Sequence, residues 1–280
     1  MAQTPFTPPP HLHEDVTRAV DVLHKLTDPA HHRKFSGVDT MSGSELFMCS
    51  GVVYHRVWKA GFGLSVEHGR GMVLNKIYTT TGATTPADMY NANNNTTATK
   101  FWSWSPPLFI TVNAASIGAT LGYAEIDSYT ILDTPEAVQS FSKSYVELDT
   151  VLNAAVGSAA ATSLPATAVN ISNTKLGDKE FTYSVVASEG LIFDVSLAGV
   201  QYSVDENKND EAYGGGGGGG IVVTPQQILN GGVGMHGEMQ TEMDVLYNAL
   251  DQVILGYMGS DEYQVQLRQQ QQQRRRQHQE

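Results

Sequence analysis

The apolar positions of this chain follow a helical spacing near both ends. From Leu12 to Leu26 they recur every three or four residues, which predicts an amphipathic helix that ends before Pro29. The same spacing returns in Met239–Ile254 and predicts a second amphipathic helix there. We therefore expect helices to flank whatever structure lies between them.

Start signals mark shorter helices inside the chain. Thr134 and Thr224 each precede a proline, so each threonine is a candidate N-cap with proline in the first helical position. A further short helix is expected around Ser44–Met48. These helices interrupt sequence that is otherwise typical of strands.

Apolar segments punctuated by glycine fill the middle of the chain and predict strands. Residues 51–78 indicate two or three strands with turns near Gly61 and Gly69, strands resume over 102–133, and two more follow at about 181–187 and 190–204. In strands, glycine marks bulges, bends and close approaches of backbones. We expect an α+β fold: a curved, barrel-like antiparallel sheet with flanking helices.

The organisation along the chain indicates one domain with irregular ends. Residues 12–258 form the expected domain, within which 79–100 and 205–220 resemble flexible loop inserts, the latter ending in a run of glycines. The proline-rich residues 1–11 and the polar, glutamine- and arginine-rich residues 259–280 are expected to be disordered.

Charge and composition exclude some classes of function. The 280 residues are 41% hydrophobic, enough for a sizeable core, and carry a formal net charge of −12, which argues against a nucleic-acid binder. The charge is uneven, because residues 1–80 hold eight Lys/Arg against seven Asp/Glu. If the protein meets an anionic surface, we expect these first 80 residues to face it.

The cysteine content and the apolar segments of the sequence indicate where in the cell the protein resides. Cys49 is the single cysteine, so no intrachain disulfide can form, which suits a reducing compartment. The first ten residues have neither the basic nor the apolar region of a secretory signal, and no apolar run approaches the roughly 20 residues of a membrane-spanning helix. We expect a cytoplasmic protein.

Motifs for catalysis and metal binding are weak. The sequence has no nucleophile elbow, zinc-protease motif or Cys-x-x-Cys pair. The pairs His11/His13 and His31/His32 offer imidazole ligands, but on segments too irregular for a rigid site. We therefore expect no enzyme, no cofactor and no metal.

The helix over 12–27 has two interpretations. An apolar face beside basic side chains is what a peripheral membrane helix offers, and each Lys or Arg near an anionic leaflet contributes about 1 kcal/mol. The same apolar stripe is also what packs a helix onto a sheet. Asp15 and Asp21 on the polar face favour packing.

Six segments, in order, are similar to those of the SYLF domain, a family of phospholipid- and actin-binding modules; together they span residues 12–231. They are the helix from Leu12, the glycine-bearing strands Val52–Leu74, Trp104–Pro107, Gly118–Asp127, Ser188–Gly199 and Thr224–Gly231.

The resemblance implies non-catalytic binding of anionic phospholipid, such as a phosphoinositide, at membrane surfaces. It also implies a link to membrane trafficking or actin organisation, and in one branch of the family actin filaments are bundled at endocytic sites. It assigns the membrane contact to the N-terminal helix and nearby basic residues. The candidate lipid-binding residues carried over are Arg18, Lys25, Arg33, Lys34, Arg56, Lys59 and Arg70.

Two other functions stay open at this point. An actin-filament or protein-interaction module without lipid binding predicts co-sedimentation with filaments that does not depend on phosphoinositide. An enzyme or lipid carrier that uses the interior of a barrel predicts an enclosed apolar cavity with convergent polar groups.

Overall fold

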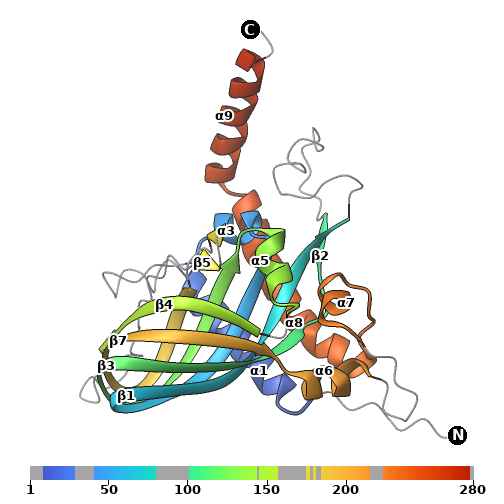
Figure 1. Ribbon diagram of the computed structural model, residues 1–280. Coiled ribbons are helices and arrows are strands. Elements are labelled where there is room, and N and C mark those ends of the chain that lie inside the picture. Colours follow the sequence, from blue (N-terminus) through green and yellow to red (C-terminus); the bar gives the residue numbers. More distant parts are fainter. Residues whose placement is uncertain are drawn as a thin grey trace, which may run out of the picture.

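Figure 1 shows a computed structural model of the chain, with helices gathered around a curved sheet. The residues that the structure describes are 9–28, 41–79, 101–143, 145–156, 175–176, 179–180, 184–214 and 223–277.

One antiparallel sheet of five strands, in the order β2-β1-β3-β7-β4, forms the body of the fold. A separate pair, β5 and β6, is also antiparallel. The expected α+β fold with flanking helices is confirmed. The sheet curves strongly (Figure 1), but the described strands do not close into a barrel, because β2 and β4 remain its edges. The strands are β1 (Gly51–Tyr78), β2 (Trp102–Trp104), β3 (Leu108–Leu132), β4 (Tyr145–Val156), β5 (Lys175–Leu176), β6 (Lys179–Glu180) and β7 (Ser184–Val204).

Strand β1 is one continuous strand of 28 residues, so the prediction of two or three strands over 51–78 was wrong. It pairs with β3 on both sides of an irregularity between Phe62 and Leu64, and the strand bends there instead of ending in a turn. β7 likewise replaces the two strands expected at 181–187 and 190–204 with one.

The glycines of β1 allow its two arms, residues 51–61 and 64–78, to touch. A Cβ placed on Gly69 would lie 2.0 Å from the carbonyl oxygen of Arg56, and one on Gly71 would lie 2.4 Å from that of Tyr54. Only a residue without a side chain fits between backbones at these separations. The expected role of glycine at close approaches is confirmed at both positions.

Helices begin where the sequence signals predicted. Thr134 accepts a hydrogen bond from the backbone N–H of Ala137, and Thr224 forms a capping box with Gln227. The helices of the described residues are α1 (Leu12–Thr27), α3 (Gly43–Met48), α5 (Pro135–Ser140), α6 (Glu206–Tyr213), α7 (Pro225–Leu229), α8 (Gly237–Met258) and α9 (Asp261–Gln277).

Two segments expected to lack regular structure contain helices. Helix α6 lies inside the segment 205–220, and the side chain of Asn209 exchanges hydrogen bonds with the backbone of Phe109 on β3. Helix α9 replaces most of the expected disordered tail and projects away from the body in Figure 1. Glutamine and arginine both have high helix propensity, which favours a helix even without packing. Residues 1–8, 80–100 and 215–222 lie outside the described residues.

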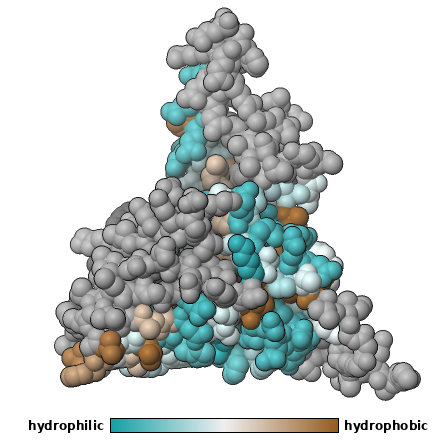
Figure 2. Space-filling view, viewed as in Figure 1, coloured by the Kyte–Doolittle hydropathy of each residue, from teal (hydrophilic) through white to brown (hydrophobic). Residues whose placement is uncertain are grey.

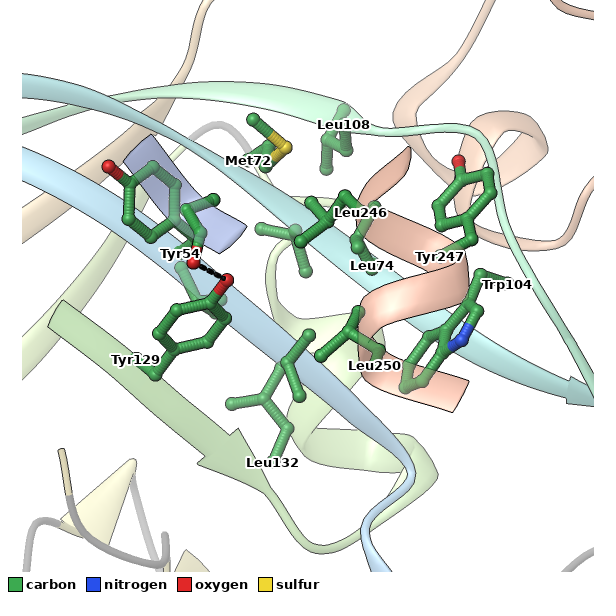
Figure 3. Close-up of a cluster of buried hydrophobic side chains, with 14 of the residues drawn as sticks. Tyr54, Met72, Leu74, Trp104, Leu108, Tyr129, Leu132, Leu246, Tyr247 and Leu250 are labelled. Carbon is green, nitrogen blue, oxygen red and sulfur yellow. Dashed lines mark hydrogen bonds between the residues drawn. The ribbon is translucent and has the colours of Figure 1, made fainter. Parts of the chain in front are cut away.

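The core lies between the sheet and helices α1 and α8. Figure 3 shows Tyr54, Leu74 and Tyr129 of the sheet near Leu246 and Leu250 of α8, all of them buried. The apolar stripe of α1 is buried as well, so packing accounts for this helix in the structure. The buried carboxylate of Asp251 has hydrogen-bond partners, which buried polar groups need. The carboxylate of Asp251 accepts hydrogen bonds from the indoles of Trp102 and Trp104 at 2.7 and 3.0 Å.

Candidate functional site: an ion network beneath the N-terminal helix

The polar face of α1 meets the two arms of β1 through arginine–carboxylate pairs. The guanidinium of Arg56, whose side chain is 8% exposed, donates to Glu14 at 2.5 Å and also to Glu125 of β3. From the other arm, Arg70 donates to both carboxylate oxygens of Asp15 at 2.9 Å. Arg–carboxylate hydrogen bonds between ionised groups are among the stronger ones in proteins.

Arg18 ties the next turn of α1 to β3. Its Nε donates to Asp127 at 2.9 Å, and its Nη2 lies 3.2 Å from Glu125. The hydroxyl of Tyr54 donates to the other oxygen of Asp127 at 2.6 Å. Lys208 of α6 lies 3.6 Å from Asp15 and completes the ion network. We use "ion network" for Glu14, Asp15, Arg18, Arg56, Arg70, Glu125, Asp127 and Lys208.

Burial and pairing act in opposite directions on the acids of the ion network. Burial raises the pKa of Asp127, while hydrogen bonds from Tyr54 and Arg18 oppose that rise. The hydrogen bond from Arg56 lowers the pKa of the more exposed Glu14. The network therefore holds four basic and four acidic groups close together, and their charges balance within the protein.

An aromatic ring supports the arginines. The indole of Trp58 lies 5.2 Å from the guanidinium carbon of Arg56 and 5.6 Å from that of Arg70, within the range of cation–π attraction. Trp58 thus contacts one arginine from each arm of β1.

The other candidate lipid-binding residues lie apart from the ion network. Lys59 is 1% exposed, and its ammonium lies 2.7 Å from Glu67. Lys25 lies one turn from Asp21 on α1, at 3.3 Å. Arg33 and Lys34 lie outside the described residues. The structure brings together only Arg18, Arg56 and Arg70 of the seven, and their assignment to lipid contact stays a prediction.

Sequence reasoning missed the acidic half of the network. Glu125 and Asp127 are two residues apart on a strand and therefore share a face, and the register places them opposite Trp58 and Arg56. That alternation can be read from the sequence, whereas the pairing of β1 with β3 cannot. Glu14 gave no signal beyond its place in the first turn of α1.

A second surface lies at the bend of β1 and β3, where Figure 2 shows apolar side chains at one end of the molecule. Phe62 is 87% exposed, and the other four members are between 53% and 66% exposed. The alternation Phe62-x-Leu64-x-Val66 was its signal in the sequence. We call this surface the apolar tip; it consists of Phe62, Leu64, Val66, Leu121 and Tyr123.

The described part of the structure has neither a candidate membrane-spanning helix nor a candidate metal-binding cluster. No helix there is both long enough and apolar enough to cross a membrane. In the same ranges, no three histidine, cysteine or acidic side chains are grouped so that they could hold a metal ion. Among the histidines considered as ligands, His13 instead lies 2.8 Å from Glu242 of α8.

Comparison with protein families identifies residues 113–253, half of the chain, as a match to Ysc84, described as a Las17-binding protein actin regulator. The chain belongs to the Ysc84 family. The SYLF resemblance is thereby confirmed. The match runs from within β3 to within α8, so it begins after all seven candidate lipid-binding residues. Comparisons with curated proteins and with solved structures found no match.

Proposed function

We propose that this chain is a binding module that regulates actin filaments, without catalysis. The observation that carries the proposal is the family match, whose description names actin regulation and binding to Las17. The matched region contains β7 and most of β3 and of α8, so the part shared with the family includes much of the sheet and of one helix that packs on it.

Filament co-sedimentation of the full chain tests this proposal. We expect the chain to pellet with actin filaments in a saturable manner and to change their bundling or assembly rate, with or without added Las17. A chain that neither pellets with filaments, nor binds Las17, nor changes assembly would contradict it.

We propose further that the module acts in the cytoplasm, peripherally at membranes, by binding anionic phospholipid such as a phosphoinositide. Lys25 lies near the end of α1, and Arg33 and Lys34 follow it in the sequence. These residues support the proposal of lipid binding, because clustered basic side chains attract an anionic leaflet. Arg18, Arg56 and Arg70 are engaged with carboxylates. These arginines would contact lipid only if α1 moved away and a lipid phosphate took the place of Glu14 and Asp15.

Vesicle flotation tests the proposed lipid binding by comparing neutral, phosphatidylserine and phosphoinositide vesicles at low and physiological salt. We expect Arg33→Glu with Lys34→Glu to reduce flotation with anionic vesicles, because the electrostatic attraction is reversed. Lys143→Glu, at an exposed lysine after α5, is the control for reversing a positive charge elsewhere on the surface. Unchanged flotation of the double variant at low salt would contradict the assignment.

An actin-filament or protein-interaction module without lipid binding is the second candidate. The internal pairing of Arg56 and Arg70 favours it, because these cations already have protein partners. It predicts the same co-sedimentation with filaments whether or not phosphoinositide vesicles are present.

A further inference from the structure

The apolar tip has no role in the functions considered so far, yet it is the most exposed apolar feature among the described residues. Five large apolar side chains, each more than half exposed, lie within two short stretches of β1 and β3. Scattered surface apolar residues need no explanation, but a contiguous group of them marks an interaction surface.

The strand register places further apolar residues in line with the tip. Phe62 is opposite Leu121, Leu121 is opposite Phe193 of β7, and Phe193 is opposite Val156 of β4. A second row repeats the pattern with leucine and isoleucine. The members of this second row are Leu64, Ile117, Leu197 and Leu152. Apolar residues therefore occupy two rows across four strands, at the end where the paired strands β1 and β3 (the β1–β3 ribbon) bend.

Charge decides which partner suits this surface. The stretches 60–66 and 121–123 contain no ionisable residue except Tyr123, and the nearest lysine, Lys59, is buried against Glu67. The whole chain carries −12, so a second copy would repel it, and the tip itself offers no cation to an anionic headgroup. An uncharged hydrocarbon layer matches an uncharged tip and meets no such repulsion.

We propose that the apolar tip inserts into the lipid bilayer, with Phe62, Leu64 and Leu121 entering the acyl layer beneath the headgroups. The inference deepens the membrane association proposed above and rests on it. It differs in its physical basis, because the attraction comes from removing apolar surface from water and is insensitive to salt.

The first test is flotation of the full chain with phosphatidylcholine vesicles at low and high salt. We expect binding that salt leaves unchanged, and a loss of at least about tenfold in Phe62→Thr with Leu64→Thr, since burying one large apolar side chain is worth about tenfold or more in affinity. Threonine keeps the strand preference of the backbone. Val245→Thr, at a 52% exposed position on α8, is the matched control and should bind like wild type.

The second test places a probe on the tip. Cys49 is buried, so Leu64→Cys offers a single accessible thiol for an environment-sensitive fluorophore. We expect a blue shift of its emission when phosphatidylcholine vesicles are added. The same label on Val245→Cys should show no shift. No shift at position 64 would overturn the proposal.

Other outcomes separate this inference from the proposed lipid function. Binding only to anionic vesicles, abolished by salt and unaffected by the tip substitutions, would support the basic residues and overturn the tip. A dimer in analytical ultracentrifugation that the double variant dissociates, with no binding to phosphatidylcholine, would overturn it in favour of a second copy. Tip-dependent binding that persists in Arg33→Glu with Lys34→Glu would support the tip even if anionic recognition fails.

Discussion

The two ends of the β1–β3 ribbon have opposite polarity. Beneath α1, the ribbon buries Arg56 and Asp127 in contact with other charges, whereas at its bend it exposes Phe62 and Leu121. Both ends come from the same pair of strands with the same alternation of side chains. What packs against each end therefore determines which side chains are buried, and the polarity of the residues alone does not.

The ion network is costly to form and costly to break. Taking charges out of water carries a large desolvation penalty, which mutual attraction offsets only when every partner is present. The apolar tip has the reverse property, since its side chains make few contacts whose loss would matter to folding. Four substitutions or conditions test this difference, from the largest expected effect to the smallest.

Removing one cation from the ion network should have the largest effect. We expect Arg56→Met to lower the free energy of unfolding by about 3 kcal/mol, because Glu125 and Glu14 would each lose a partner. Urea unfolding of the full chain measures this. Lys25→Met, which breaks the pair with Asp21 near the surface, should cost less than about 1 kcal/mol. Equal midpoints for Arg56→Met and wild type would show that the network does not hold α1 to the sheet.

Acid should destabilise the folded ribbon through His55. Burial lowers the pKa of His55 from 6.5 to about 4, and its Nδ1 has no hydrogen-bond partner. The unfolded chain therefore binds this proton first as pH falls, so stability is full above the unfolded pKa and is lost between about pH 6.5 and pH 4. The loss amounts to about 3 kcal/mol at most.

Thermal unfolding across that pH range measures the effect. His55→Gln should flatten the pH dependence, because glutamine does not titrate, whereas His24→Gln at an exposed position of α1 should not. A pH profile of His55→Gln that matches wild type would exclude His55 as the source.

Adding one methyl group where the arms of β1 touch should have an intermediate effect. We expect Gly69→Ala to cost about 1–3 kcal/mol, since its Cβ would collide with the carbonyl oxygen of Arg56 and force the arms apart. Gly256→Ala in α8 is the matched control: nothing lies within 4 Å of its Cβ position, and alanine should stabilise the helix by up to about 1 kcal/mol. Similar melting temperatures for the two variants would argue against contact between the arms.

Substitution at the apolar tip should have the smallest effect on folding. We expect Phe62→Thr and Leu64→Thr each to change the free energy of unfolding by less than about 0.5 kcal/mol, because both side chains are already in water. The same change at the buried Phe109 should cost about 3–5 kcal/mol, as removal of a buried aromatic does. A large loss at Phe62 would mean that the tip supports the fold, and the contrast between the two ends would fail.

Local features of the fold were predictable from the sequence. Thr134 and Thr224 marked helix starts because a hydroxyl before a proline satisfies the first free N–H groups. The turn expected near Gly69 was wrong because glycine permits a turn and a close backbone contact equally well. Only the pairing of both arms with β3 distinguishes the two.

The candidate site was less predictable than the fold. The sequence identified Arg18, Arg56 and Arg70 as basic residues near a helix, but not that carboxylates of α1 and β3 meet them. Glu14 and Arg56 are 42 residues apart in the chain, and Arg56 and Glu125 are 69 apart. No local pattern specifies which acid reaches which base over such separations.

The sequence by itself determined the positions of α1, α3, α5, α7 and α8, the residues on the buried stripe of α1 and the glycines that the ribbon requires, because spacing and backbone preference act over a few residues. Tertiary structure alone decided that β1 is one bent strand, that its arginines are paired inside and that Phe62 faces water. Partner choice depends on the register and bend of strands distant in sequence, and these are fixed only when the whole sheet packs against α1 and α8.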